Sequence, residues 1–351
     1  MVHAPDIVAP PLAAIFGTSG PTLSDAERAF FGSVRPLGYI LFSRNVESPQ
    51  QVSALVADLR GLDPGREPLI LIDQEGGRVQ RLRPPHWRFA PCGAEFAELY
   101  AADASAALRA LRLNMNLIGQ ELAELGIDVD CAPVLDVPVS GAHDVIGDRA
   151  YGHTPESVAA LAVAAAEGLV DSGIVPVIKH IPGHGRATAD SHKELPVVDA
   201  DIATLRATDF RAFAAFLAAR PSPAFGMTAH VVYRAIDADR PATQSPAVIA
   251  DIIRGEIGFD GLLMSDDLSM QALTGSFEHR TESSLAAGCD AVLHCNGNMT
   301  EMSAVARAAT PLGVRGMSAL EAVAPIRLKP RRPPLETASA AAIVINLLRR
   351  V

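Results

Sequence analysis

The 351-residue chain has few cysteines, one tryptophan and a deficit of basic residues. Its four cysteines show no CxxC spacing, which excludes a disulfide framework or a four-cysteine zinc site and indicates a reduced, cytoplasmic protein. Lys and Arg number 30 against 40 Asp and Glu, and the formal net charge is -10. Because phosphate binding needs clustered Lys and Arg, we expect no nucleic-acid partner.

Long hydrophobic runs are also missing. No apolar run approaches the roughly 18 residues that span a bilayer, so no membrane partner is expected. Residues 1–15 lack a basic stretch followed by an apolar one, so they do not indicate a signal peptide. The 49% hydrophobic and 5% aromatic content describes an interior rich in small aliphatic side chains. We expect a single domain over 1–351, with a core at about 12–310 and a helical tail at about 311–351.

Short apolar runs recur along the chain. Each is of strand length and fit for burial on both faces, which is typical of a parallel sheet. The runs lie at 12–16, 38–42, 69–73, 127–136, 175–180, 224–230, 262–266 and 291–295.

Helical segments with credible ends lie between these runs. Ser48 begins a capping box with proline at the first helical position, and Gly61 ends that helix. Further helices are predicted at 94–125, 155–173, 246–255 and 336–349. Eight strand–helix units indicate an α/β fold of the (β/α)₈ TIM-barrel type. An open doubly wound sheet is the competing prediction, but no G-x-G-x-x-G follows the first run.

Chemistry-bearing residues follow one strand after another. The open, C-terminal end of a barrel gathers such positions at a common mouth. They are Asp73, Asp136, Lys179 with His180, His230, Asp266 and Asn296.

The densest stretch follows the run at 175–180 and contains His180, His184 and His192. The alternative to a functional role for this stretch is a polar loop that happens to be rich in histidine. The spacing of His180 and His184 matches a helical pair of zinc ligands, but Pro182 and Gly183 between them are incompatible with a helix. We therefore expect no metal.

Two groups have the character of a catalytic pair. Asp266, at the end of an apolar strand, is suited to be a nucleophile in glycosyl transfer. Its alternative role is a helix cap, which the neighbouring Asp267 is able to fill instead. His192 is suited to general acid/base work, and Asp190 two residues earlier is placed to orient the ring. The alternative for this pair is an ordinary loop turn.

A second group combines carboxylates with guanidinium groups. Asp73 stands at a strand end and is followed by a Gly-Gly turn and by Arg81, while Arg149 lies in a separate loop. Such groups together bind sugar hydroxyls from several directions. The alternative is an internal ion pair that makes the loop rigid.

At these residues the chain resembles glycoside hydrolase family 3, in particular its bacterial β-N-acetylhexosaminidases of the NagZ type. The resemblance covers about residues 15–310. It is carried by Asp73-Gln74-Glu75-Gly76-Gly77-Arg78, Ala132-Pro133-Val134-Leu135-Asp136-Val137, Lys179-His180-x-Pro182-Gly183-His184-Gly185, Asp190-Ser191-His192 and Ser265-Asp266-Asp267-Leu268-Ser269-Met270. One departure is Ile181, where an aromatic residue is commoner.

The resemblance implies a retaining β-N-acetylglucosaminidase on a (β/α)₈ barrel, with Asp266 as nucleophile and His192, held by Asp190, as acid/base. The positions that match the family's binding residues for the terminal N-acetylglucosamine are Asp73, Arg81, Arg149, Lys179 and His180. It implies no metal or organic cofactor. The implied role is removal of β-linked N-acetylglucosamine from cytoplasmic muropeptides in cell-wall recycling, by a monomer acting on an N-acetylglucosamine-anhydromuropeptide-like substrate.

Three alternatives remain open. An imidazole acid/base does not repel an anion as a carboxylate does, so phosphate as acceptor, and a phosphorylase, is one of them. The second is an inactive sugar-binding homologue, although it would be expected to lack Asp266 or the Asp190–His192 pair. The third is a metal-dependent amidohydrolase, which needs a His-x-His pair where Gly17-Thr18-Ser19 stands.

Overall fold

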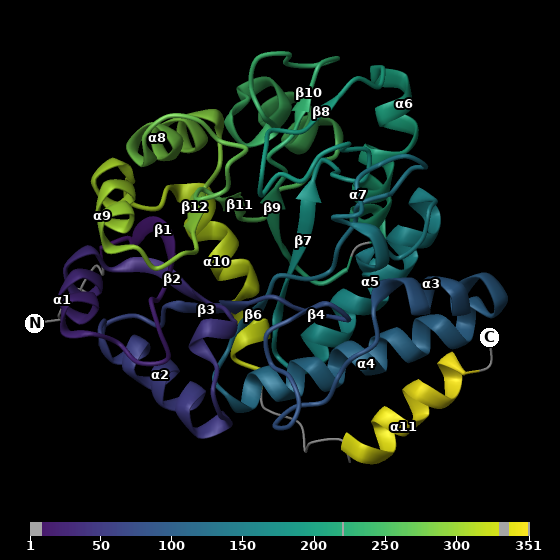
Figure 1. Ribbon diagram of the computed structural model, residues 1–351, viewed down its shortest axis with the longest axis horizontal. Coiled ribbons are helices and arrows are strands. Elements are labelled where there is room, and N and C mark those ends of the chain that lie inside the picture. Colours follow the sequence, from purple (N-terminus) through teal and green to yellow (C-terminus); the bar gives the residue numbers. More distant parts are fainter. Residues whose placement is uncertain (1–8, 220, 330–336, 350–351) are drawn as a thin grey trace, which may run out of the picture.

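The computed structural model describes residues 9–219, 221–329 and 337–349, and in them eight parallel strands form a closed barrel with helices around it (Figure 1). The barrel strands are β1 (Leu12–Gly17), β2 (Pro36–Leu41), β3 (Leu69–Ile72), β6 (Val129–Asp130), β7 (Val175–Ile181), β9 (Phe225–Thr228), β11 (Leu263–Asp267) and β12 (Ala291–His294). Their spatial order is β1-β12-β11-β9-β7-β6-β3-β2, and β1 and β12 close the ring. The predicted (β/α)₈ barrel is confirmed, and the open sheet is wrong.

The remaining elements surround this ring or cover its ends. The helices are α1 (Asp25–Val34), α2 (Pro49–Gly61), α3 (Gly93–Ala102), α4 (Ala104–Glu124), α5 (Pro155–Asp171), α6 (Ile202–Ala207), α7 (Asp209–Ala218), α8 (Phe277–Ala287), α9 (Met299–Ala308), α10 (Val314–Arg327) and α11 (Thr337–Leu348). Short helical turns are η1 (Ser43–Asn45), η2 (Gly147–Arg149) and η3 (Ala242–Gln244), and η4 (Val248–Glu256) is a π-helix. Outside the barrel, β4 (Gln74–Gly76) pairs with β5 (Val79–Gln80), and β8 (Val197–Val198) with β10 (Val232–Tyr233).

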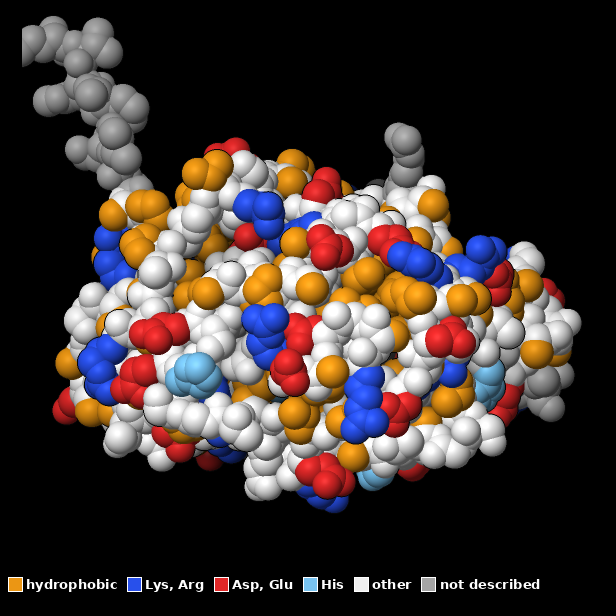
Figure 2. Space-filling model, turned by 90° about the horizontal axis from the view of Figure 1, so that it is seen from above, with side chains coloured by type: hydrophobic (Ala, Val, Ile, Leu, Met, Phe, Trp, Pro, Cys, Tyr) orange, Lys and Arg blue, Asp and Glu red, His pale blue; other side chains and the backbone are white. Residues whose placement is uncertain are grey.

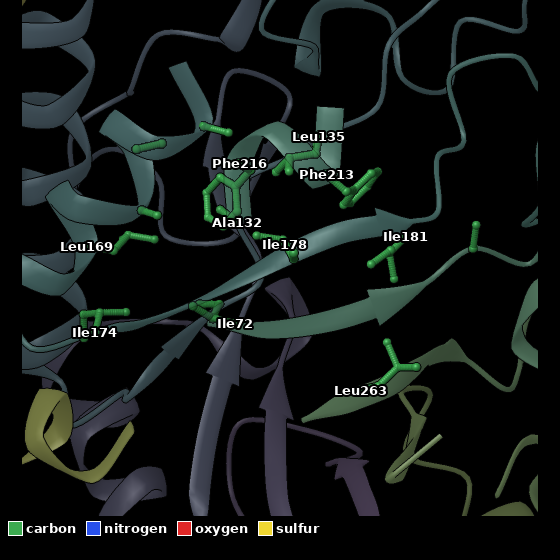
Figure 3. Close-up of a cluster of buried hydrophobic side chains, with 14 of the residues drawn as sticks. Ile72, Ala132, Leu135, Leu169, Ile174, Ile178, Ile181, Phe213, Phe216 and Leu263 are labelled. Carbon is green, nitrogen blue, oxygen red and sulfur yellow. The ribbon is translucent and has the colours of Figure 1, made fainter. Parts of the chain in front are cut away.

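Alternation along the strands produces two hydrophobic layers. On β1, Ile15 belongs to the cluster inside the barrel, whereas Phe16 belongs to the cluster between strands and helices. In that outer cluster, Ile178 of β7 lies near Phe213 and Phe216 of α7 (Figure 3). Full burial of one such side chain contributes about 1.5–3 kcal/mol, so this shell fixes the strands that carry the mouth.

Helix α10 closes the end of the barrel opposite the mouth. Its Val323 and Ile326 belong to the inner cluster together with Leu69 and Val175, which begin their strands. Helix α11 lies against α4 and α3, with Ala340 and Val344 buried (Figure 1). It confirms the helix predicted at 336–349. Residues 330–336 of the predicted tail and residues 1–8 of the N-terminal stretch lie outside the described residues.

Several predicted boundaries are wrong. The helix predicted at 94–125 is two helices, because Asp103 accepts a hydrogen bond from the Ala106 amide and starts α4 afresh. The strand predicted at 127–136 keeps regular pairing only over β6, because Pro133 lacks the amide that the ladder needs. The capping box at Ser48 is half formed. Its hydroxyl accepts from the Gln51 amide, but the Gln51 side chain accepts from Glu47 instead.

The helices predicted at 155–173 and 246–255 are present as α5 and as the π-helix η4. Among the described residues, no helix combines the length and the apolar character that crossing a bilayer requires. Acidic and basic side chains are interspersed on the face shown in Figure 2.

Candidate active site

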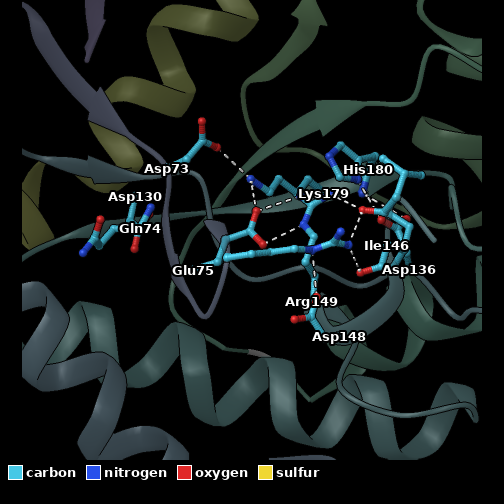
Figure 4. A network of polar contacts seen from close by, with 12 residues as sticks. Asp73, Gln74, Glu75, Asp130, Asp136, Ile146, Asp148, Arg149, Lys179 and His180 are labelled. Atoms are coloured by element: carbon cyan, nitrogen blue, oxygen red, sulfur yellow. Dashed lines mark hydrogen bonds and ion pairs between the residues drawn. The ribbon is translucent and has the colours of Figure 1, made fainter. Parts of the chain in front are cut away.

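The mouth of the barrel contains a cluster of five charged side chains from four segments. Figure 4 shows four of them, Asp73, Glu75, Arg149 and Lys179. Lys179 at the end of β7 is buried, and its Nζ lies 2.8 Å from Asp73 Oδ1 and 2.7 Å from Glu75 Oε1. Arg149 in η2 binds both oxygens of Glu75 at 2.8 Å, and Arg81 Nη2 lies 2.9 Å from Asp73 Oδ2. These contacts join four of the five predicted binding residues.

Each charged side chain in this cluster stabilises the ionised form of its oppositely charged neighbours. Burial raises the pKa of Asp73, but Lys179 and Arg81 outweigh it and keep that pKa well below its usual range. For Glu75, burial is likewise outweighed by Arg149 and Lys179, and its pKa falls to about 2. Burial opposes the charge of Lys179 too, yet the two carboxylates raise its pKa. The internal ion pairs of the alternative interpretation are thus present. The Asp73 side chain is 14% exposed, which is enough for it to accept a hydrogen bond from a hydroxyl group of a bound molecule.

His180, the fifth predicted binding residue, lies beside a fully buried carboxylate. Asp136 Oδ2 is 2.7 Å from His180 Nδ1, and Asp136 Oδ1 accepts from the backbone amides of His180 at 3.2 Å and His184 at 2.6 Å. Burial raises the pKa of Asp136, but the His180 ring and its hydrogen bond lower it to about 2. Asp136 therefore fixes the orientation of the His180 ring at the mouth.

Asp266, on β11, lies within the electrostatic reach of three histidines. Burial raises its pKa, but His230, His180, the Asp267 amide and His192 together lower it, so the carboxylate is ionised. His230 is fully buried, with Nε2 3.0 Å from the Asp267 carbonyl and Nδ1 2.7 Å from Thr243 Oγ1. The carbonyl can only accept, so Nε2 carries the proton of that bond, and burial lowers the pKa of the ring.

Asp190 and His192 form the predicted pair on the loop after β7. Asp190 Oδ1 accepts from His192 Nδ1 at 2.9 Å and from the His192 amide at 3.0 Å. Burial opposes ionisation of Asp190, but these two bonds lower its pKa. The His192 side chain is 65% exposed. With Nδ1 bound to Asp190, Nε2 is the nitrogen that is free to exchange a proton with a bound molecule.

Two strand-end residues form local hydrogen bonds, and one of the alternatives considered for them is wrong. Asp267 does not cap a helix: it ends β11 and accepts from the amides of Ser269 and Cys295, and Ser276 caps α8 instead. Asn296 donates to Glu301 at 2.6 Å and accepts from the Asn298 amide, so it organises the start of α9.

The sequence analysis assigned no role to some residues of the site. Glu75 has the same sequence signal as Asp73, two positions away and so on the same face of an extended segment. His184 and Ser191 form a buried contact, described below, that no spacing rule indicates. Among the described residues, no group of three or more His, Cys, Asp or Glu is placed to hold a metal ion.

Ionised carboxylates, imidazoles and cations at the open end of a (β/α)₈ barrel suit an enzyme that binds a hydroxyl-rich substrate and breaks a glycosidic bond. The protein is such a glycoside hydrolase. A family model, the glycosyl hydrolase family 3 N terminal domain, matches residues 30–324, and the chain belongs to this family.

Known proteins show the same relationship. A β-hexosaminidase of Methylococcus capsulatus is 43% identical over 284 residues, which are 80% of this chain and 82% of that protein. The structure of NagZ from Neisseria gonorrhoeae in complex with N-trifluoroacetyl-D-glucosamine has a TM-score of 0.85 at 30% identity, covering 97% of this chain and 99% of that one. A family 3 β-N-acetylglucosaminidase from Paenibacillus has a TM-score of 0.83 at 29% identity, covering 95% and 66%.

Proposed function

We propose that this protein is a retaining β-N-acetylglucosaminidase, with residues 1–351 as one catalytic unit. The observation that carries the proposal is the ionised carboxylate of Asp266 at the same mouth as His192, whose ring Asp190 fixes through Nδ1. The names of the similar proteins, β-hexosaminidase and NagZ, support the choice of an N-acetylated amino sugar.

The charged cluster and His180 are proposed to bind the terminal sugar. Asp73 accepts hydrogen bonds from hydroxyl groups, while Arg81, Arg149 and Lys179 donate to oxygen atoms of the sugar. These side chains are held by one another before the substrate arrives, so little conformational entropy is lost on binding. His180, oriented by Asp136, completes the subsite.

Catalysis is proposed to take place in two displacements. Asp266 attacks the anomeric carbon while His192 gives its Nε2 proton to the departing glycosidic oxygen, so a covalent glycosyl-enzyme forms and the aglycone leaves. His192 then takes a proton from water, and the water oxygen displaces Asp266 with net retention. Asp190 stabilises the imidazolium form of His192, which is present before the first step and is formed again in the second.

The proposed substrates are cytoplasmic muropeptides that carry a terminal β-linked N-acetylglucosamine, as in cell-wall recycling. The thiols of Cys92, Cys131, Cys289 and Cys295 are all free, which supports a reducing compartment. We propose that the enzyme acts as a monomer without a cofactor.

A phosphorylase is the second candidate, favoured by the use of an imidazole where a carboxylate would repel phosphate. The test is turnover of an aryl β-N-acetylglucosaminide with and without phosphate, with products resolved by mass. Free N-acetylglucosamine under both conditions supports the hydrolase, whereas a sugar 1-phosphate moves the assignment to a phosphorylase. If no product forms under either condition, the protein is an inactive sugar-binding homologue.

A further inference from the structure

The loop that carries Asp190 and His192, residues 186–195 and here called the dyad loop, is fastened at its start by Arg186, which pairs with Asp209, and near its middle by a buried side-chain contact. His184 Nε2 lies 3.1 Å from Ser191 Oγ, and both residues are almost completely buried. We propose that His184 and Ser191 form a latch that positions His192 over the mouth. This inference rests on the proposed acid/base role of His192 and assigns two positioning residues to it.

The barrel side of the latch is rigid. The His184 amide donates to the buried carboxylate of Asp136 at 2.6 Å, and the Tyr233 hydroxyl donates to the Gly183 carbonyl. Gly183 has φ +139°, and a Cβ on Gly185 would lie 2.1 Å from the Val137 carbonyl oxygen. The turn therefore requires glycine at both positions and fits closely against the segment after β6, which leaves the His184 ring little freedom.

On the loop side of the latch, Ser191 and the residue that follows it differ strongly in solvent exposure. Ser191 is 2% exposed, while the neighbouring His192 side chain is 65% exposed. Ser191 and His192 lie in a turn in which the Asp190 carbonyl accepts from the amides of Lys193 and Glu194. Because adjacent residues of a closed turn have a fixed relative orientation, holding the Ser191 hydroxyl inward restricts the direction of His192, the residue that is proposed to transfer the proton.

A second set of contacts sets the loop against the strand of the nucleophile. The Ser191 carbonyl accepts from the Ala272 amide at 3.2 Å, and the His192 carbonyl accepts from the Gln271 amide at 3.4 Å. Residues 271 and 272 follow β11, which carries Asp266. These two hydrogen bonds fix the position of the dyad loop relative to the segment that carries Asp266. Asp266 and His192 are proposed to act on the same glycosidic bond, which requires such a fixed relative position.

Within the described residues, the His184 ring has one hydrogen-bond partner and an edge contact with the His180 ring. The His184 Nδ1 is buried without a hydrogen-bond partner, so the Ser191 hydroxyl is the polar contact of this ring. Burial, followed by the nearby His180, lowers the pKa of His184 to about 4, which keeps the ring neutral in ordinary buffers. The latch is a neutral hydrogen bond, and removal of its hydroxyl leaves a buried nitrogen unpaired.

Loss of the latch should affect proton transfer more than sugar binding. Ser191→Ala is expected to lower kcat for a natural disaccharide, which needs its leaving group protonated, by about tenfold, equivalent to about 1.4 kcal/mol. Hydrolysis of an aryl glycoside with a good leaving group should fall by less than about threefold, because that departure needs little acid. KM for both substrates should stay near the wild-type value.

Ser172→Ala is the matched control, since it removes a part-buried hydroxyl that bonds Asn116 between α4 and α5, away from the mouth. It should lower kcat for both substrates alike, if at all. Hydrogen exchange at the amides of Gln271 and Ala272 should be faster in Ser191→Ala than in either the wild type or the control.

His192→Ala separates the two levels of the proposal. If it affects both substrates equally, the acid/base role itself is wrong. If it discriminates between them but Ser191→Ala does not, or leaves exchange at Gln271 and Ala272 unchanged, the latch is wrong and the proposed function stands.

Discussion

Asp136→Asn removes a buried negative charge while it keeps the shape of the side chain. Asp136 accepts three hydrogen bonds, two from the backbone amides of His180 and His184 and one at the His180 ring. An asparagine oxygen is able to accept from the two amides. Its NH₂ group would face His180 Nδ1, so the charge-assisted bond is lost.

The size of the effect follows from the pKa of Asp136, which lies at about 2 against an ordinary value of 3.8. At about 1.4 kcal/mol for each pH unit, that gap contributes about 2–3 kcal/mol to the free energy of unfolding. Because the folded-state pKa is the lower one, the contribution is complete above pH 3.8 and is lost as the pH falls toward 2. We therefore expect Asp136→Asn to be about 2–3 kcal/mol less stable at pH 7, with a raised KM because His180 loses its orientation.

Urea unfolding of both proteins at pH 7 and pH 5 measures this difference. It should be the same at the two pH values, since both lie above 3.8. Asp58→Asn, in a surface ion pair with Arg28, is the matched control and should cost less than about 1 kcal/mol. If Asp136→Asn destabilises no more than this control does, the ionic account of how His180 is held is refuted.

Three further predictions concern the catalytic pair and one distant carboxyl group. Asp266→Ala should reduce kcat by about a thousandfold or more without unfolding the barrel, and retention of about a tenth of the activity would refute the nucleophile assignment. His192→Ala should retain more activity on aryl glycosides than on natural glycosides, and equal losses would contradict an acid/base role. Glu121, 3.3 Å from Arg88, has its pKa raised to about 7 because burial outweighs that cation. Its folded-state pKa is the higher one, so its contribution is complete below about 4.5 and is lost as the pH rises through 7. Glu121→Gln should therefore raise the free energy of unfolding at pH 8 by about 2–3 kcal/mol relative to its effect at pH 4.5, and thermal unfolding at the two pH values would show no such gain if the reasoning is wrong.

The barrel was predictable because its signals are local. Each strand is an apolar run such as Leu69–Ile72, and helices such as α2 and α5 have a capping residue followed by proline. The break at Asp103 was missed because alanines surround it and favour a continuous helix, although an aspartate is itself a good helix cap.

The site was predictable only in part, for a physical reason. Asp190 and His192 are neighbours in sequence, so their contact follows from the loop alone. The contacts of Glu75 with Arg149, and of Asp136 with His180, join segments that only the closed barrel brings together. The sequence marks such residues as strand ends, but it does not tell which of them meet.

Closure of the barrel by β1 and β12 also has a consequence for synthesis of the protein on the ribosome. Ala14 pairs with Val292, so the partner of the first strand emerges only when most of the chain has been made. At elongation rates of about 5–20 residues per second, that strand waits for roughly 15–60 s with one edge unpaired. An apolar strand with a free edge is prone to pair with other chains. Yield in cells should therefore depend on how fast translation proceeds through the last third of the message and on the chaperones that cover the nascent chain.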